Sequence, residues 1–293
     1  MLRSGNDAAV ALAEHVGGNI ENFALMMNKK AHELNLSDTH FVTPHGLDND
    51  EHYTTAFDLA NLADYALNNE IFAKIVKTKT HTIFINNQPK TISNTNELLG
   101  NFEGVYGVKT GFTNGANRCL VTSCKRNNLD FICIVLGCDT KKDRTRDSIK
   151  LLDYSFKNYT LVDLKSIANS KFEEWNKSHK SSFYINKGKS QNLNLYLDGS
   201  DFTFENIALK KSAKDSIDFE IDFTHFFEAP ICQKTKIGTF HLYVSNKKYY
   251  SIDILIKNEI ERKGVFDYIS HIFRNYCYFF TNKYEYDIFH QTN

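Results

Sequence analysis

The sequence predicts an α/β (α+β) domain in its N-terminal half, followed by a small all-β domain and a terminal amphipathic helix. Three observations predict this order. Apolar residues recur at helical spacing in residues 7–34 and again after Thr55, runs that alternate apolar and polar residues begin near Tyr159, and helical spacing returns from Lys263. The expected boundaries are therefore residues 1–158, 159–260 and 261–283, and 293 residues are enough for two domains with separate cores.

Composition and charge exclude several classes of protein. Lys and Arg together number 35, as do Asp and Glu, so the formal net charge is zero. A general nucleic-acid-binding protein needs a basic surface, and this balance argues against one. The first residues, Met1 to Asn6, contain neither a basic leader nor an apolar run, so the chain shows no signal peptide.

Two helices are expected in residues 7–34 and a third after Thr55. Gly17 and Gly18 separate the first two, because glycines favour the end of a helix. Thr55 is a typical N-terminal capping residue, and Asp58, three positions later, is its expected capping partner. The apolar positions that define the three helices are Ala8, Ala9, Leu12 and Val16, then Phe23, Met26, Met27 and Leu34, then Leu59, Leu62, Ala63 and Ala66.

Residues 104–137 predict a strand, a tight turn and a second strand, after a turn-rich loop and a short strand at residues 81–85. Lys109-Thr110-Gly111 lies at the opening of the first strand. The turn is expected at residues 125–128, and residues 131–136 are nearly continuous apolar sequence, as in a strand buried on both faces. A helix from about Asp143 to Phe156 is expected to pack on this sheet.

The spacing of apolar residues changes near Tyr159. Residues 193–197, 217–223 and 240–244 alternate apolar and polar side chains, which predicts a small antiparallel sandwich or barrel. From Lys263 the apolar residues follow one side of a helix, with Asp267 and Arg274 among the polar residues on the other. Because charges at the centre of a bilayer are costly, this helix is expected to lie on a membrane surface. The alternative is a helix that covers the β-domain.

The cysteines and histidines do not predict a metal site. Four of the six cysteines lie between positions 119 and 138, but neighbouring ones are spaced unlike the pairs of structural zinc sites. The expected hairpin register places Cys119 opposite Ile134 and Leu120 opposite Cys133, so these four are interpreted as small core thiols. The histidines and acids of residues 40–52 match no common ligand spacing, and no cofactor is expected.

Two short motifs carry the candidate chemistry. Ser4-Gly5-Asn6 precedes a helix, and Lys109-Thr110-Gly111 follows on a strand, in the order typical of penicillin-binding proteins and class A β-lactamases. Either tripeptide alone is more often a helix cap or a solvated strand end. The sequence around them therefore decides between these interpretations.

That sequence resembles a known enzyme family. The stretches "SGNDAAVALAEHVGGN", "MNKKAHELNLSDTHFVTPHGLDNDEHYTTAFDLANLA" and "GVKTGFTNGANRCLVTSCKRNNLDFICIVLG" are similar to the serine-type D-alanyl-D-alanine carboxypeptidases, the low-molecular-weight penicillin-binding proteins of peptidase family S11. The resemblance is dense over about residues 1–157 and weaker through "APICQKTKIGTFHLYV" and the terminal helix. It implies a penicillin-binding/β-lactamase-like transpeptidase fold, with a C-terminal β-domain and a membrane anchor.

The resemblance implies how the strand motif is used. Lys109 and Thr110 would hold the free carboxylate of a peptide ending in D-Ala-D-Ala, for which a lysine charge and a hydroxyl are suited. Gly111 would leave room for the substrate to lie along the strand edge. The backbone N–H of Phe112 would donate a hydrogen bond to the oxyanion.

The first motif has implied roles as well. Asn6 would bind the substrate's amide, and Ser4 would help pass a proton to the leaving D-alanine. The implied enzyme trims peptidoglycan stem peptides through an acyl-enzyme, and it would bind β-lactams where its nucleophile is supplied. Its implied location is extracytoplasmic and membrane-associated.

The family's nucleophile is not found at its expected place. It lies in a Ser-x-x-Lys sequence N-terminal to Ser-Gly-Asn, and only three residues precede Ser4. The one Ser-x-x-Lys of the chain, Ser245 to Lys248, follows both motifs in a turn-like stretch. The chain is therefore expected to be an N-terminally truncated fragment, with Met1 an internal methionine, and to be inactive alone.

Two alternative functions remain open. One is a non-catalytic module that binds cell-wall peptides and keeps the ligand-holding residues without a nucleophile. The other is a class A β-lactamase, which would need a deacylating glutamate in Glu-x-x-Leu-Asn. Ala31 occupies the position of that glutamate in "AHELN", which disfavours the lactamase.

Overall fold

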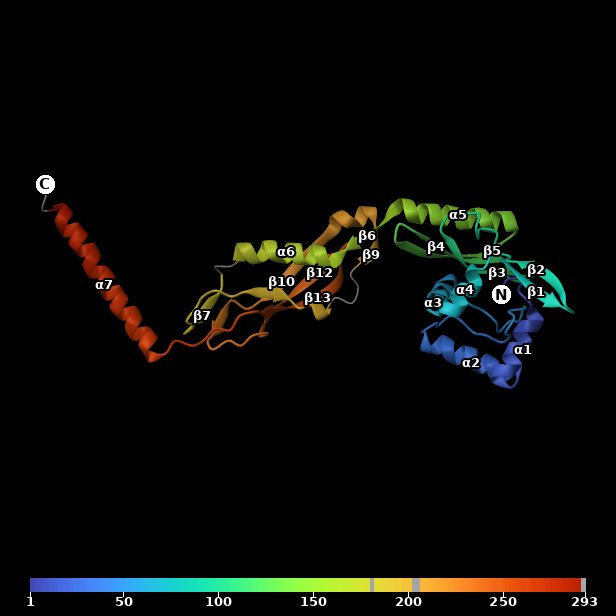
Figure 1. The fold of residues 1–293 in the computed structure, drawn as a ribbon, viewed down its shortest axis with the longest axis horizontal. Coiled ribbons are helices and arrows are strands. Elements are labelled where there is room, and N and C mark those ends of the chain that lie inside the picture. The colour runs from blue at the N-terminus through green and yellow to red at the C-terminus, as the bar shows by residue number, and fades with distance from the viewer. Residues whose placement is uncertain (180–181, 202–205, 291–293) are drawn as a thin grey trace. The chain divides into compact units, whose positions relative to one another are not determined.

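The computed structural model describes residues 1–179, 182–201 and 206–290, which form two compact units, Met1–Thr160 and Leu161–Asn293 (Figure 1). The N-terminal unit contains α1 (Asn6–Gly17), α2 (Ile20–Glu33), α3 (Ala56–Leu67), α4 (Glu70–Lys77), β1 (Thr80–Ile85), β2 (Gln88–Ser93), β3 (Val105–Thr113), β4 (Asn117–Arg126), β5 (Leu129–Cys138) and α5 (Lys141–Asn158). The helices predicted from periodicity are confirmed, whereas β2 was not predicted.

Local sequence explains where these helices begin and end. Gly18 follows α1 with φ of 78°, a left-handed conformation that glycine adopts without steric cost. Thr55 Oγ1 accepts a hydrogen bond from Asp58 N at 3.1 Å, which confirms the predicted cap of α3. The carboxylate of Asp58 does not complete a capping box. It is 2% exposed and accepts hydrogen bonds from Asp38 N at 3.0 Å and Thr39 Oγ1 at 2.7 Å.

The segment 104–137 forms three antiparallel strands in the order β3-β4-β5, not the two predicted. The residues between Thr113 and Asn117 make an additional turn, whose Asn-Gly sequence favours a reversal of the chain. Lys109 consequently lies in the interior of β3 instead of at its opening. Because β3 pairs only with β4 among the described strands, β3 is an edge strand.

The predicted register of the second hairpin was also wrong. Asn127 and Asn128, with φ of 48° and 65°, form a two-residue turn, because asparagine tolerates the left-handed region. This turn sets Leu120 opposite Val135, instead of opposite Cys133. All six cysteines are free, and the predicted core position is confirmed for Cys124 and Cys133 only, since Cys119 and Cys138 are half-buried.

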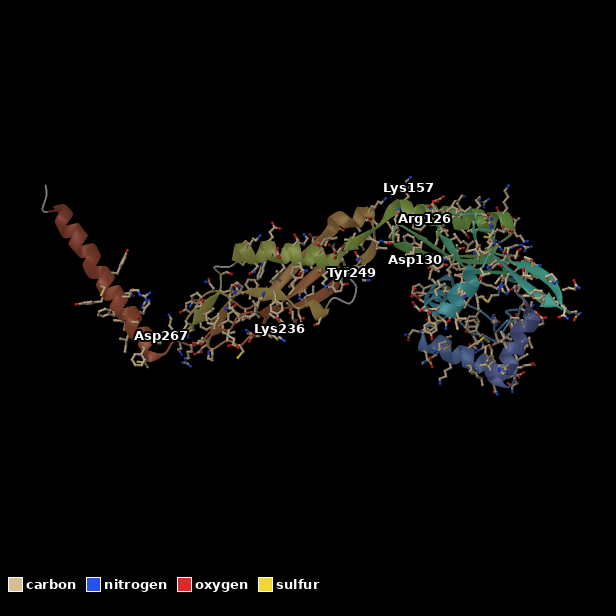
Figure 2. All side chains as sticks on the ribbon, viewed as in Figure 1. Arg126, Asp130, Lys157, Lys236, Tyr249 and Asp267 are labelled. Carbon is tan, nitrogen blue, oxygen red and sulfur yellow. The ribbon has the colours of Figure 1, made fainter. Side chains whose placement is uncertain are left out.

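Helix α5 covers one face of this sheet (Figure 1). Cys124, Cys133 and Val135 form a buried cluster with Leu152 of α5. At the same end of β4, two residues after Cys124, Arg126 (labelled in Figure 2) lies 4.4 Å over the ring of Phe102 and donates a hydrogen bond to the carbonyl of Glu103 at 2.8 Å. These contacts join the end of β4 to the segment that precedes β3.

The C-terminal unit is built on a four-stranded antiparallel sheet in the order β10-β12-β13-β8. Its elements are β6 (Tyr159–Asp163), α6 (Leu164–His179), β7 (Tyr184–Asn186), β8 (Leu195–Leu197), η1 (Gly199–Asp201), β9 (Asn206–Lys210), η2 (Lys211–Ser216), β10 (Ile217–Phe223), β11 (Phe226–Glu228), β12 (Lys236–Val244), β13 (Lys247–Ile256) and α7 (Val265–His290). The predicted alternating runs coincide with β8, β10 and β12.

A helix that the sequence pattern did not indicate covers this sheet. Phe172 and Trp175 of α6 belong to the same buried core as Phe240 of β12. Ser245 and Asn246 form the β12–β13 turn with positive φ angles, so the Ser-x-x-Lys sequence at this position begins in a hairpin turn, as predicted.

The terminal helix α7 begins after Gly264, whose N–H donates a hydrogen bond to the carboxylate of Asp267 at 2.8 Å (Figure 2). From Val265 to Tyr278, the apolar side chains are exposed, with Phe266 86% and Ile272 68% exposed. Within the described part of the chain, no helix combines the length and the apolar character needed to span a bilayer.

Candidate active site

The structure brings Ser4 and Lys109 together across 105 positions of sequence. Lys109 Nζ donates a hydrogen bond to Ser4 Oγ at 2.7 Å, and it also contacts the carbonyl oxygen of Thr110. Ser4 has a φ of 57° and stands at the end of a short turn, in which its N–H bonds the carbonyl of Met1. The N-terminal turn therefore presents a hydroxyl to a lysine of the edge strand.

A chain of hydrogen bonds holds this turn against β3. Leu2 is buried, and its carbonyl accepts a hydrogen bond from Thr95 N at 3.1 Å. Thr95 Oγ1 lies 2.7 Å from Thr110 Oγ1, and Asn96 Nδ2 donates to the carbonyl of Gly107 at 2.9 Å. Because a buried polar group is costly to leave unpaired, these bonds restrict the position of Ser4 relative to Lys109.

Thr110 is less open to a ligand than the sequence suggested. Its side chain is 9% exposed, and its hydroxyl is engaged with Thr95. A hydroxyl has one donor and two acceptor positions, so this pairing leaves capacity for a further hydrogen bond.

Gly111 and Phe112 are exposed at the edge of the sheet. A Cβ atom built at Gly111 would meet the Cβ of Cys119 at 3.5 Å, an ordinary contact, so the fold itself does not require glycine at this position. The guanidinium carbon of Arg118 lies over the ring of Phe112, 3.9 Å from the ring centre.

Asn6 begins α1, two residues after Ser4, and is exposed. Among the described side chains, Asn6 makes no hydrogen bond with Ser4 or Lys109. The structure thus places Asn6 near Ser4 in the chain and leaves its amide available to solvent.

Arg144 is a second cation at this site, and the sequence analysis did not single it out. It is 3% exposed on α5, its Nη2 lies 3.8 Å from Glu97 Oε2, and its Nε has no hydrogen-bond partner in the described structure. A signal was available: Arg144, Ser148 and Leu152 are one turn apart and all face the sheet.

The positive charge of Arg144 acts on Lys109. Burial lowers the pKa of Lys109, and the positive charge of Arg144 lowers it further. Burial is likewise the main cause that lowers the pKa of Arg144, and the nearby charge of Glu97 opposes that shift. An anion bound at Lys109 would favour the charged form of the lysine, because an opposite charge offsets part of the cost of its burial. The arrangement is therefore suited to a small carboxylate.

The loop of residues 35–54 is fixed to the far end of β3. Asp48 Oδ2 accepts a hydrogen bond from Gly115 N at 3.1 Å, and the Thr113 hydroxyl is the main cause that lowers the pKa of Asp48. A cavity of about 620 Å³ lies between this loop and the β3–β4 turn, with Tyr53 and Cys119 on its wall. Since Cys119 pairs with Gly111, the cavity reaches the strand that carries the motif.

The histidines of this loop are used for local structure. His40 Nδ1 lies 2.6 Å from the carbonyl of Glu51, and His52 Nδ1 accepts a hydrogen bond from Val42 N at 3.0 Å. Within the described residues, no group of three or more His, Cys, Asp or Glu side chains is arranged to hold a metal ion. Ala31, at the position where a lactamase would need its glutamate, is buried in α2.

The fold is that of the penicillin-binding transpeptidases. Penicillin-binding protein 5 of Haemophilus influenzae superimposes with a TM-score of 0.60 at 27% identity, over 88% of this chain and 72% of that one. Penicillin-binding protein 6B of Escherichia coli gives a TM-score of 0.61 at 27% identity, over 86% of this chain and 66% of that one.

Sequence comparison gives the family within that fold. Residues 1–140 match the family model of peptidase S11, described as D-alanyl-D-alanine carboxypeptidase. D-alanyl-D-alanine carboxypeptidase DacF of Bacillus subtilis is 33% identical over 276 residues, 92% of this chain and 66% of its own length. DacD of Escherichia coli is 37% identical over 166 residues, 56% of this chain and 42% of its own length. The chain belongs to the S11 family of serine-type D-alanyl-D-alanine carboxypeptidases, and it spans about two thirds or less of these relatives.

Proposed function

We propose that the N-terminal unit binds the free carboxylate of a peptide ending in D-Ala-D-Ala and serves in the trimming of peptidoglycan stem peptides. The observation that carries the proposal is the 2.7 Å hydrogen bond between Lys109 Nζ and Ser4 Oγ on an exposed strand edge. The buried Arg144, whose positive charge lowers the pKa of Lys109, supports an anionic ligand.

In this proposal each motif residue has one task. Lys109 and the hydroxyl of Thr110 hold the terminal carboxylate, while the substrate backbone adds to the edge of β3 beside Gly111. The N–H of Phe112 donates to the carbonyl oxygen that becomes negative in the transition state.

Ser4 and Asn6 act on the other side of the bond that is cleaved. Ser4 relays a proton to the nitrogen of the leaving D-alanine, because its hydroxyl is held by a lysine and can both accept and donate. Asn6 offers an amide that pairs with the peptide backbone of the substrate.

We also propose that residues 1–293 alone are acylated neither by the peptide nor by penicillin. Acyl transfer needs a serine activated by a neighbouring base, and the one Ser-x-x-Lys of this sequence begins in the β12–β13 turn of the other unit. Asp7, three residues after Ser4, is a carboxylate where such a base would be a lysine. This observation also favours the second candidate, a peptide-binding module that does not hydrolyse its ligand.

Two measurements test the proposal. Titration of ¹⁵N-labelled protein with acetyl-L-Lys-D-Ala-D-Ala should shift the amide signals of Lys109 to Phe112 and of Ser4, and leave the β12–β13 turn unchanged. Fluorescent penicillin should not label residues 1–293 covalently. A labelled band that Ser4→Ala abolishes would show that the chain carries its own nucleophile.

We also propose that α7 lies on a membrane surface. Its exposed apolar residues and its interspersed Asp267 and Arg274 support a helix that is buried on one side only.

A further inference from the structure

The cavity of about 620 Å³ beside the β3–β4 turn has no part in the proposed roles of the motif residues. It lies between the loop of residues 46–54 and the sheet. Cys119 of β4 and Leu136 of β5 line it from the sheet, and Leu59 of α3 also contributes. Its volume falls within the range of about 300–1,000 Å³ that is typical of ligand sites.

The cavity is continuous with the face of β3 that carries Lys109. Side chains alternate along a strand, so Lys109, Gly111 and Thr113 point to the same face of the sheet. Thr113 lines the cavity, and Gly111 pairs with Cys119 on its wall. A Cβ atom built at Gly111 would meet Cys119 Cβ at 3.5 Å and no other atom within 4 Å. The space over Gly111 is therefore open toward the cavity.

The proposed function determines which part of the peptide reaches this cavity. In it, Lys109 holds the terminal carboxylate, and the N–H of Phe112 donates to the carbonyl oxygen of the residue before the terminal one. The peptide therefore runs antiparallel to β3. Because each residue of an extended chain advances about 3.3 Å, the third residue from the C-terminus lies beside Thr113 and the turn that follows it. Its side chain is the one nearest to the cavity.

The cavity is acidic. Among the described residues that line it, Asp48 and Asp50 carry carboxylates, and none is a lysine or an arginine. The hydrogen bond from the Thr113 hydroxyl is the main cause that lowers the pKa of Asp48, so this carboxylate is charged at neutral pH. Burial is the main cause that lowers the pKa of His52, so the imidazole adds no positive charge there. The cavity therefore favours a cation over a neutral or anionic group.

Asp50 and Tyr53 leave polar groups available to a ligand. Asp48 is already engaged, since it accepts a hydrogen bond from Gly115 N at 3.1 Å and holds the loop to the turn. The carboxylate of Asp50 and the hydroxyl of Tyr53 make no hydrogen bond or ion pair with the described part of the chain. Tyr53 is 55% exposed, and the face of an aromatic ring attracts an ammonium group. The two side chains together are suited to a primary amine.

We propose that this cavity is a specificity site for the residue that precedes D-Ala-D-Ala, and that it takes a side chain ending in a primary ammonium group. The inference rests on the proposed function, because the peptide must first lie along β3. Asp50 pairs with the ammonium group beside the ring of Tyr53, and the methylene chain passes over Gly111. A side chain that carries a carboxylate next to its amine is disfavoured, because Asp48 and Asp50 repel it.

Three peptides that differ only in this side chain test the charge preference. Acetyl-L-Lys-D-Ala-D-Ala carries the ammonium group, and a second peptide has norleucine, which is uncharged, in place of the lysine. A third has meso-diaminopimelic acid, which adds a carboxylate beside the amine. Titration calorimetry with residues 1–293 should give a Kd for the lysine peptide that is about 3- to 10-fold lower than the Kd of either other peptide.

Asp50→Asn should remove this preference. The variant should bind the lysine peptide about 3- to 10-fold more weakly and the norleucine peptide with unchanged affinity, because only the charged side chain loses a partner. The matched control is Glu51→Gln, which neutralises the next acid of the same loop, outside the cavity wall. It should leave both affinities unchanged. A preference that survives Asp50→Asn, or that Glu51→Gln removes equally, would overturn the assignment.

Cys119 reports whether the side chain enters the cavity. Its thiol is half-buried on the cavity wall, whereas Cys232 and Cys277 are exposed in the C-terminal unit. At a saturating concentration of the lysine peptide, alkylation of Cys119 by iodoacetamide should slow by at least about fivefold, because thiol reactions depend on access. Alkylation of Cys232 in the same samples should not change. An unaltered rate at Cys119, measured by mass spectrometry, would contradict the proposed position of the side chain.

These outcomes separate the cavity from the carboxylate site on β3. If the lysine and norleucine peptides bind with the same Kd, the cavity is not a specificity site, while binding of the peptide carboxylate at Lys109 still stands. If none of the three peptides binds, the proposed function and the specificity site are both wrong.

Discussion

Replacing Gly111 by alanine tests whether a ligand lies along the edge of β3. The added Cβ would have Cys119 Cβ, at 3.5 Å, as its nearest neighbour in the protein, and Gly111 does not adopt a left-handed backbone conformation. The folded chain therefore accepts the methyl group, and the free energy of unfolding should change by less than about 0.5 kcal/mol. The methyl points to the same face of the strand as Lys109, two residues before it.

The effect on peptide binding should be much larger. A methyl group forced into a filled contact costs about 1–3 kcal/mol, which raises a Kd by about 5- to 150-fold. Isothermal titration calorimetry with acetyl-L-Lys-D-Ala-D-Ala measures the Kd, and urea unfolding measures the stability of the same samples.

Gly107→Ala is the control for a glycine that the fold does require. A Cβ there would meet Ser123 Oγ at 2.8 Å and Val76 Cγ2 at 3.1 Å, so this substitution should lower stability by about 1–3 kcal/mol. The folded fraction should still bind the peptide. If Gly111→Ala bound the peptide as tightly as the unaltered chain, the substrate would not lie along β3.

Three further predictions follow from the same structure. Burial, and then the charge of Arg144, lower the pKa of Lys109 below 10.5. Peptide affinity should therefore be full at neutral pH, where the lysine is charged, and fall as the pH rises through that lowered pKa. An affinity that stays constant to pH 10.5 would contradict this. Asp58→Asn should lower the free energy of unfolding by about 1.5–3 kcal/mol, because the buried carboxylate of Asp58 accepts two hydrogen bonds. In the same urea unfolding experiment, the control Asp64→Asn on the same helix should change it by less than about 0.5 kcal/mol. Phe266→Asp should reduce flotation of the chain with phospholipid vesicles by about tenfold, and Tyr249→Asp should not; equal flotation of the two would favour a helix that packs on protein.

The sequence predicted most elements of the N-terminal unit, because their signals are local. The glycines after α1 and the threonines before α3 and α5 act within one turn of the helix that they end or begin. The turn before Asn117 was missed although its Asn-Gly sequence is visible, because the apolar residues on both sides suggested one longer strand. That error placed Lys109 at the start of a strand whose interior it occupies.

The residues that the sequence could not assign act over long distances. Asp58 was interpreted as a helix cap, but its buried carboxylate binds a loop twenty positions earlier in the chain. In the sequence Arg144 is one of several charges on a charged helix, and only the tertiary structure shows that it is buried and that its charge acts on Lys109. Helix α6 was missed because the segments that follow it in the chain alternate apolar and polar residues, a pattern that predicts strands.

The pairing of Ser4 with Lys109 was different, because two motifs 105 positions apart and a family resemblance together predicted it. The structure brings the two side chains within hydrogen-bond distance. Their chemical roles, as opposed to their proximity, remain a proposal that binding measurements can test.

The most direct of these compares a peptide acid with its amide. Acetyl-L-Lys-D-Ala-D-Ala and the same peptide with a C-terminal amide differ only in the charge that Lys109 is proposed to hold. A hydrogen bond to a charged group contributes about 1.5–3 kcal/mol, so the acid should bind about 10- to 150-fold more tightly than the amide by titration calorimetry, and Lys109→Met should remove that difference. Equal affinities of acid and amide for the unaltered chain would contradict the assignment of this strand edge as a site for a peptide carboxylate.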